Sequence, residues 1–113
     1  MNARTTGFNP EYHRDPPAIE ALRAEPGKVL LEFGAPWCGH CLAARDAVQA
    51  LMASHPALAH IKVYDGKGQP LGRAFGVKLW PTLIVLDNGQ EVARAVRPRS
   101  EGELSGLASA LAS

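Results

Sequence analysis

The spacing of hydrophobic and polar residues along the chain predicts four β-strands. Near-continuous apolar runs at Val29–Phe33 and Thr82–Leu86 indicate strands that are covered on both faces. Apolar and polar residues alternate at Ile61–Tyr64, which indicates a further strand. The tight-turn sequence Asp87-Asn88-Gly89 predicts a hairpin that joins the second apolar run to a strand at Glu91–Val96.

Apolar residues at helical spacing predict two helices in the first half of the chain. The first is expected to begin at Asp15 as its N-cap, with prolines in the first turn, and to end before Pro26-Gly27. The second begins at Cys38, and its apolar positions recur until Ser54-His55-Pro56 ends the helix.

Two more helices are expected in the second half. A short helix is predicted at Gln69–Phe75, closed by Gly76. The last helix runs from Ser100 to the C-terminus, with Ser100 and Glu103 in a capping box. The order helix, strand, helix, strand, helix, strand, strand, helix predicts an α/β fold with a central mixed β-sheet flanked by helices on both faces.

Residues 1–14 show no clear period. We expect them to form a loose N-terminal extension, with at most one short edge strand, before a single domain at residues 15–113. A length of 113 residues suits one domain with a core of its own.

Composition and charge narrow the function classes. The chain is 46% hydrophobic and 20% charged, as is usual for a globular domain, and its formal net charge of +1 gives no reason to expect a nucleic-acid or membrane partner. No apolar run is long enough to span a bilayer, and the N-terminus lacks the apolar stretch of a secretory signal. We therefore expect a cytoplasmic monomer. A periplasmic or secreted protein whose signal has been removed would have the same sequence.

The only two cysteines, Cys38 and Cys41, stand three positions apart at the start of the predicted second helix. Cysteine reacts as a thiolate, and the unpaired N–H groups and positive dipole end of a helix start favour negative charge on Cys38. Cys41 lies one turn further along the same face. We expect the pair to cycle between dithiol and disulfide, with Cys38 attacking a substrate disulfide and Cys41 resolving the mixed disulfide.

Other uses of the cysteine pair fit the sequence less well. A zinc site would need two further ligands, which the other histidines do not supply at a suitable spacing, so no metal is expected. Haem attachment is not indicated, because His40 precedes Cys41 instead of following it. Two inert core cysteines would not need Gly39 and His40 between them.

The stretch Trp37-Cys38-Gly39-His40-Cys41 follows a buried strand, and Trp80-Pro81-Thr82 stands about forty residues beyond Cys41. With this order of elements over roughly residues 16–112, the chain resembles the thioredoxin superfamily. The resemblance implies a thioredoxin fold and a cis peptide bond at Pro81, beside the cysteine pair. It also implies a groove for an extended substrate, with Trp80 and Pro81 as one wall and Trp37 and Gly39 as another.

Glu32 is a charged residue in the middle of a strand that is otherwise apolar. Burial would raise the pKa of its carboxyl, which could then exchange a proton near neutral pH. The resemblance implies that this carboxylate assists proton transfer to the second cysteine, with glutamate as in the protein disulfide isomerases. Lys62 falls on the neighbouring strand, where thioredoxins place a lysine, and a Glu32–Lys62 pair would balance the buried charge.

The sequence departs from the usual thioredoxin pattern at His40, at Arg97, and near Arg45-Asp46, where the proline of the active-site helix is missing. His40 stands where thioredoxins usually have proline and disulfide isomerases have histidine. When protonated, it would add positive charge beside Cys38 and favour the reduced form. We therefore expect a reduction potential between about −270 mV, typical of thioredoxin, and about −180 mV, typical of the isomerase. Arg97 stands where the family has glycine after the last strand, and it would alter the third wall of the groove.

The expected function is that of a thioredoxin-like protein-disulfide oxidoreductase that acts as a reductant. Electrons would come from a thioredoxin-reductase-like enzyme or a small thiol, and no cofactor is needed beyond the Cys38–Cys41 disulfide. Two alternatives remain open. One is a disulfide oxidase or isomerase in an oxidising compartment, which His40 favours. The other is a non-catalytic adaptor with a thioredoxin fold, whose cysteines are incidental or regulatory.

Overall fold

A computed structural model describes residues 3–112 and contains one five-stranded sheet, with strand order β1-β3-β2-β4-β5. The strands are β1 (Arg4–Thr6), β2 (Lys28–Gly34), β3 (Ala59–Tyr64), β4 (Thr82–Asp87) and β5 (Gln90–Val96). Strands β2 and β3 are parallel, and the other neighbouring strands are antiparallel. The predicted mixed sheet is therefore confirmed.

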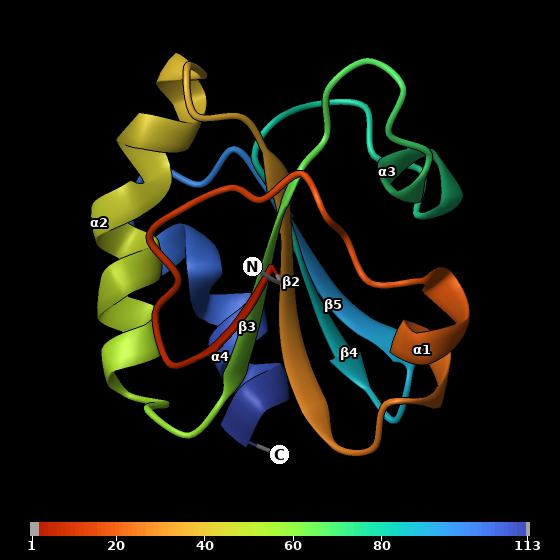
Figure 1. Ribbon diagram of the computed structural model, residues 1–113. Coiled ribbons are helices and arrows are strands. Elements are labelled where there is room, and N and C mark those ends of the chain that lie inside the picture. Colours follow the sequence, from red (N-terminus) through yellow and green to blue (C-terminus); the bar gives the residue numbers. More distant parts are fainter. Residues whose placement is uncertain (1–2, 113) are drawn as a thin grey trace.

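Helices cover both faces of the sheet. They are α1 (Ile19–Ala24), α2 (Gly39–Ala53), α3 (Leu71–Ala74), the 3₁₀-helix η1 (Glu101–Leu104) and α4 (Ser105–Ala112). In Figure 1 the sheet is seen nearly edge-on, with α1 and α3 on one side and α2 and α4 on the other. This confirms the layered α/β architecture that the element order predicts.

Strand β2 lies at the centre, and its side chains alternate between two apolar layers. Val29, Leu31 and Phe33 are fully buried in the layer that includes residues of α1 and α3. Leu30 points the opposite way, into the layer that α2 and α4 complete. Because side chains two positions apart in a strand share a face, Glu32 lies on the same face as Leu30, toward α2.

Helix α1 begins later than predicted, and Asp15 is not its N-cap. Asp15 and Pro16 each precede a proline, and the residue before a proline is disfavoured in the helical conformation. No helix forms before Ile19, and Ala18, with a ψ of 145°, stands at the N-cap position without a side-chain capping bond.

The start of the C-terminal helix also differs in detail. Ser100 precedes η1, but its side chain makes no capping hydrogen bond. The carboxylate of Glu103 instead accepts a hydrogen bond from the backbone N–H of Arg99 at 3.1 Å. The predicted capping box between Ser100 and Glu103 is therefore wrong, and the helix opens with a 3₁₀ turn.

Strands β4 and β5 form the predicted hairpin. Asn88 and Gly89 have φ values of 51° and 81°, the left-handed pair that a two-residue turn of this kind requires. The Asn88 side chain also accepts a hydrogen bond from the backbone N–H of Gly27 at 2.8 Å. The turn is thus tied to the loop that leads into β2.

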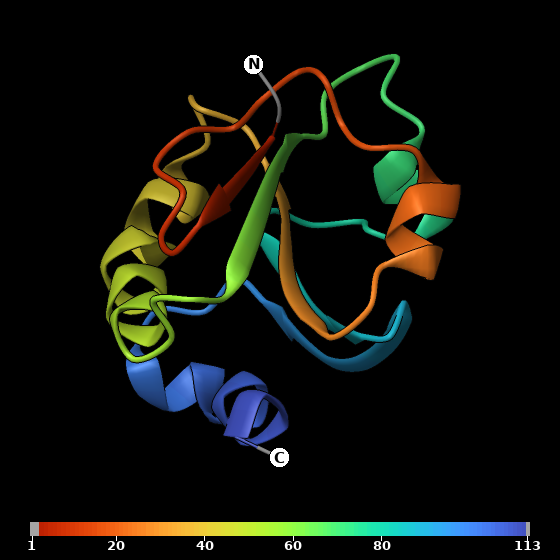
Figure 2. The same cartoon turned by 60° about the horizontal axis from the view of Figure 1, so that its bottom comes forward.

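The short edge strand allowed for in the N-terminal residues is confirmed as β1, but the expectation that these residues are otherwise loose is wrong for residues 3–14. Strand β1 pairs with β3 at the sheet edge, where Figure 2 shows it as a short arrow beside the longer strand. Asn9 is fully buried, and its side-chain amide donates to the carbonyl oxygens of Ala3 at 2.8 Å and His60 at 3.2 Å. Polar contacts hold this segment, which explains why its sequence has no hydrophobic period. Residues 1–2 lie outside the described residues, and the division after residue 14 stays a prediction.

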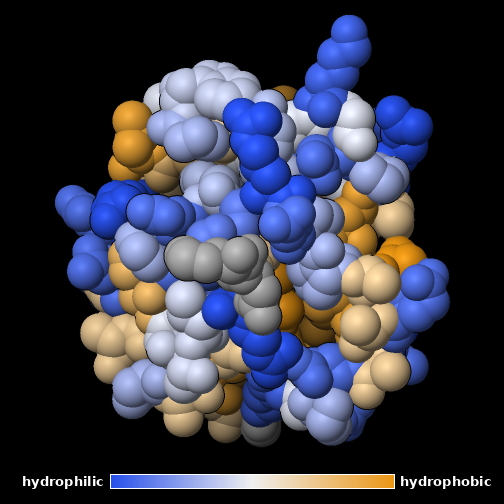
Figure 3. All heavy atoms as spheres, in the orientation of Figure 1, coloured by the Kyte–Doolittle hydropathy of each residue, from blue (hydrophilic) through white to orange (hydrophobic). Residues whose placement is uncertain are grey.

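The surface seen from the side of the N-terminal segment is mostly hydrophilic. Apolar residues are visible there in a hollow between this segment and α1, and in further patches toward the left and right edges of the view (Figure 3). Within residues 3–112, no helix is long and apolar enough to cross a membrane.

Candidate active site

The two cysteines meet at the start of α2. Cys38 is the N-cap residue, and its Sγ accepts a hydrogen bond from the backbone N–H of Cys41 at 3.2 Å. Both are free thiols; Cys38 is half-buried, whereas Cys41 is only 6% exposed. The backbone is extended at the N-cap and helical after it, which brings the residue three positions on back toward the cap. The pair therefore presents one accessible sulfur with a shielded sulfur behind it.

Cys41 holds its proton strongly. Burial raises the pKa of its thiol to about 12, and the hydrogen bond with Cys38 adds to this increase. Interactions with the Tyr12 hydroxyl and with the backbone of Ala35 offset part of this increase. Cys41 therefore needs a group that takes its proton before it can act as a nucleophile.

Glu32 is a carboxyl group on β2, the strand that precedes the cysteine pair, and it is 3% exposed. Its Oε1 pairs with Nε2 of His60 at 2.9 Å, and its Oε2 accepts a hydrogen bond from the hydroxyl of Tyr12. The backbone N–H of Asn9 donates to Nδ1 of His60 at 3.0 Å, so this nitrogen carries no proton. Nε2 of the neutral ring must then carry it and donate to Glu32. Two donors thus hold Glu32 as a carboxylate.

The raised pKa that the sequence predicted for Glu32 is wrong. Burial raises the pKa of Glu32, but the interactions with His60, the charge of Lys62 and the hydrogen bond with Tyr12 together outweigh burial and lower the pKa below its ordinary value. The direct Glu32–Lys62 ion pair is not formed either. Lys62 lies opposite Glu32 in the register of β2 and β3, but its Nζ lies over the Tyr12 ring, 4.4 Å from the centroid. Burial lowers the pKa of Lys62, and the charge of Glu32 offsets part of that effect.

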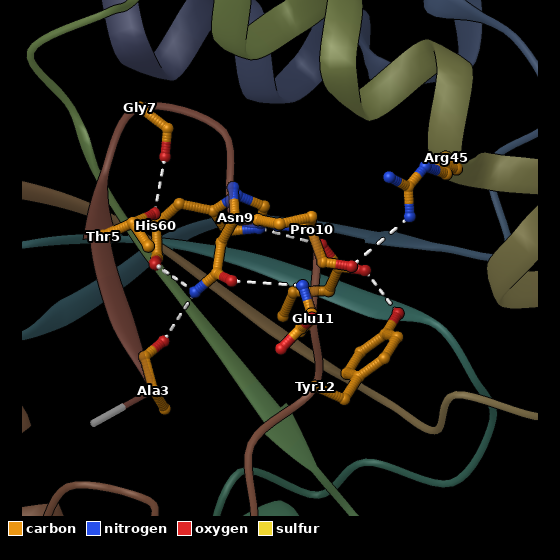
Figure 4. A network of polar contacts seen from close by, with 10 residues as sticks. Ala3, Thr5, Gly7, Asn9, Pro10, Glu11, Tyr12, Arg45 and His60 are labelled. Atoms are coloured by element: carbon orange, nitrogen blue, oxygen red, sulfur yellow. Dashed lines mark hydrogen bonds and ion pairs between the residues drawn. The ribbon is translucent and has the colours of Figure 1, made fainter. Parts of the chain in front are cut away.

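Sequence reasoning missed three residues of this cluster: Asn9, Tyr12 and His60. Figure 4 shows their polar contacts, with the N-terminal segment folded over β3. His60 lies two positions before Lys62 on the same face of β3, so a polar side chain at that spacing was a usable signal. The N-terminal segment offered no such signal, because Asn9 and Tyr12 belong to no periodic pattern.

Residues predicted to line the groove come together from three segments. The ring centroids of Trp37 and Trp80 are 6.4 Å apart in an edge-on arrangement, and Trp37 is 61% exposed. The Trp80–Pro81 peptide bond is cis. Arg97, directly after β5, donates from Nε to the carbonyl oxygen of Trp80 at 2.8 Å. The segment before α2, the start of β4 and the end of β5 therefore meet at one place.

Two neighbouring features complete this surface. The indole N–H of Trp80 donates to Oδ2 of Asp65 at 2.9 Å, which fixes the ring from the loop after β3. Burial raises the pKa of Asp65, and hydrogen bonds from Trp80 and from the backbone of Gly72 offset part of the increase. Gly39 and His40 are exposed in the first turn of α2, where a partner that reaches Cys38 also reaches them.

Comparisons with known proteins agree with this geometry. The model of the thioredoxin family matches residues 18–110. A thioredoxin of Chlamydia muridarum is 37% identical over 84 residues, which cover 74% of this chain and 81% of that protein. Thioredoxin 2 from Pseudomonas aeruginosa PAO1, solved in its reduced form, matches with a TM-score of 0.81 and 43% identity, covering 92% of this chain and 96% of that one.

A protein disulfide-isomerase of Hordeum vulgare is 36% identical over 81 residues. The match covers 66% of this chain but only 16% of the relative, so the likeness concerns one small part of that longer protein.

Proposed function

Because the chain belongs to the thioredoxin family and is a thioredoxin-like thiol–disulfide oxidoreductase, we propose that it reduces disulfides of protein substrates with Cys38 and Cys41. The observation that carries this proposal is the hydrogen bond from the Cys41 backbone N–H to Cys38 Sγ at the start of α2. It holds an accessible sulfur and a shielded one close enough to form a bond after little movement.

The proposed reaction has two exchange steps. The Cys38 thiolate attacks one sulfur of the substrate disulfide, so a mixed disulfide forms and the other substrate sulfur leaves as a thiolate. Cys41 then attacks Cys38, the Cys38–Cys41 bond forms, and the second substrate sulfur leaves. Two electrons pass from the dithiol to the substrate, and both released thiolates take up protons. The electrons reside in the sulfur atoms, so no further cofactor is required.

The substrate is proposed to be an extended polypeptide held between aromatic walls. We expect Trp37 and Gly39 on one side and Trp80 with the buried Pro81 on the other. Trp37 lies beside Trp80, and Arg97 donates to the Trp80 carbonyl and would border the third side. Exposed aromatic rings offer apolar area to a peptide at little cost in side-chain freedom. This favours a polypeptide over a small disulfide as the substrate.

We propose that the protein works as a monomer in the reducing direction, in the cytoplasm. A thioredoxin-reductase-like enzyme or a small thiol would return the electrons. The oxidase or isomerase alternative is favoured by one feature, the exposed His40 in the first turn of α2. The reduction potential distinguishes the two, and we expect a value between about −270 and −180 mV. His40→Pro should lower the potential, and an unchanged value would contradict the role given to His40.

Turnover of insulin disulfides tests the proposed function. With dithiothreitol as the electron source, the wild type should accelerate insulin reduction, and Cys38→Ser should abolish the acceleration. Cys41→Ser should lose turnover because the mixed disulfide is not resolved. A wild type that gives no acceleration would leave the adaptor alternative, in which partner binding survives in both cysteine variants.

A further inference from the structure

The hydroxyl of Tyr12 lies between two groups whose protons matter for the reaction. It donates a hydrogen bond to Oε2 of Glu32, and its oxygen and Sγ of Cys41 lie against the same backbone position, Gly34. Tyr12 belongs to the N-terminal segment and precedes the residues that the family model matches. We propose that Tyr12 is a catalytic residue that carries the proton from Cys41 to Glu32 when the mixed disulfide is resolved. This inference rests on the proposed function.

The backbone at Gly34 leaves room for this contact. A Cβ atom at Gly34 would lie 2.6 Å from Sγ of Cys41 and 2.7 Å from the hydroxyl oxygen of Tyr12. Both atoms therefore rest against the same backbone position, which only a residue without a side chain allows. A hydroxyl can accept one hydrogen bond while it donates another, so Tyr12 can take the thiol proton as it gives its own to Glu32.

The surroundings of Tyr12 suit a relay. Charged and titratable groups lie around it on the neighbouring elements: Glu32 on β2, Lys62 on β3, Cys41 and Arg45 on α2, and the adjacent Glu11. His60 on β3 contacts Glu32. Burial, followed by the charge of Glu32, raises the pKa of Tyr12 far above its ordinary value. The hydroxyl therefore stays protonated and passes protons on, whereas Glu32 acts as the base.

The proton transfer fits the stage at which it is needed. In the mixed disulfide, Cys38 is bonded to substrate, so its contributions to the raised pKa of Cys41 are removed. The Cys41 proton moves to the Tyr12 oxygen while the Tyr12 proton moves to Glu32. The electron pair left on Cys41 forms the bond to Cys38, and the substrate sulfur leaves with the electrons of the broken bond. Tyr12 ends unchanged and Glu32 ends protonated, while a cavity lined in part by Tyr12, Cys41 and Lys62 borders the relay.

Stopped-flow reaction of the reduced protein with 5,5′-dithiobis(2-nitrobenzoate) separates the two exchange steps. Attack by Cys38 releases one thionitrobenzoate, and resolution by Cys41 releases the second. Tyr12→Phe keeps the ring and removes the relay. Thr5→Val is the matched control, because it removes another hydroxyl of the same segment, one that donates to the Gly7 carbonyl at 2.8 Å.

We expect the first phase to keep its rate in all three proteins. At pH 7 the second phase should slow at least about tenfold in Tyr12→Phe only. This is less than the full effect of general acid–base catalysis, because water can enter and serve in part as a substitute. Without the relay, the proton of Cys41 must pass to solvent. The second phase of Tyr12→Phe should therefore accelerate by about tenfold per pH unit, and the gap to the wild type should narrow as the pH rises.

A second phase with the wild-type rate and pH profile in Tyr12→Phe would overturn the relay alone. Equal slowing in Thr5→Val would also overturn it, because the cause would then be a loosened N-terminal segment. Absence of the first phase in the wild type would overturn the proposed function, and the relay with it.

Discussion

Glu32→Gln removes the carboxylate charge from the buried cluster while keeping the shape of the side chain. We expect it to slow resolution by Cys41 strongly while lowering the free energy of unfolding only slightly. The amide oxygen can accept the hydrogen bond from Nε2 of His60, and the amide nitrogen can donate to the Tyr12 hydroxyl. That hydroxyl can then turn toward Cys41, so no buried donor loses its partner. The free energy of unfolding should fall by less than about 1.5 kcal/mol.

Glu32→Ala is the contrasting variant, because it removes both acceptors at once. Each buried donor left without a partner costs about 1–3 kcal/mol, so the two donors together cost about 2–6 kcal/mol, and the cavity adds to this loss. Tyr12 is half-buried and can still bond to Cys41, whereas His60 is fully buried with no other acceptor at Nε2. The lower half of the range, about 2–4 kcal/mol, is therefore expected.

Urea unfolding of the reduced protein measures the free energy of unfolding, and release of the second thionitrobenzoate measures resolution by Cys41. Glu32→Gln should slow resolution at least about tenfold at pH 7, because no carboxylate remains to accept the proton. Resolution at the wild-type rate at every pH would remove Glu32 from the mechanism. A loss below about 1 kcal/mol in Glu32→Ala would show that the two hydrogen bonds contribute little to holding the cluster.

Three further results are expected. Asn9→Ala removes the amide that donates to the Ala3 and His60 carbonyls, so urea unfolding should show a free energy of unfolding lower by about 2–4 kcal/mol. A decrease below about 1 kcal/mol would contradict the tight packing of the N-terminal segment. The Cys41 thiol has a pKa near 9.0 in the unfolded chain and about 12 in the folded protein. Because the unfolded chain loses this proton first, the stability that the thiol contributes is fully present below pH 9.0 and is lost as the pH rises toward 12. Unfolding of the reduced protein between pH 8 and 10 should show this decline, and Cys41→Ser should flatten it; equal slopes in both proteins would refute the shift. Trp80→Phe loses the hydrogen bond to Asp65, so KM for insulin should rise several-fold with kcat little changed, and an unchanged KM would remove Trp80 from the groove.

The central strands were predictable because both of their faces are buried. β2 extends one residue beyond the predicted Val29–Phe33 at each end, and β4 extends one residue beyond the predicted Thr82–Leu86 at its C-terminal end only. The start of α1 was mispredicted because Pro16 and Pro17 act on the residues before them, which outweighs the capping tendency of Asp15.

The cysteine pair could be read from the sequence because its geometry is local to one helix turn. The partners of Glu32 could not, because they come from distant parts of the chain. Register alone brings both Lys62 and His60 close to Glu32, and the pattern could not tell which of them makes the contact. Tyr12 reaches the site through a segment held by polar contacts, which leave no periodic signal.

Trapping the covalent intermediate tests most directly the claim that Cys38 attacks and Cys41 resolves. Cys41→Ser should accumulate a mixed disulfide with insulin, which non-reducing mass spectrometry would locate at Cys38, while Cys38→Ser should accumulate none. No adduct in Cys41→Ser, or an adduct at Cys41 that forms equally fast in Cys38→Ser, would contradict the claim.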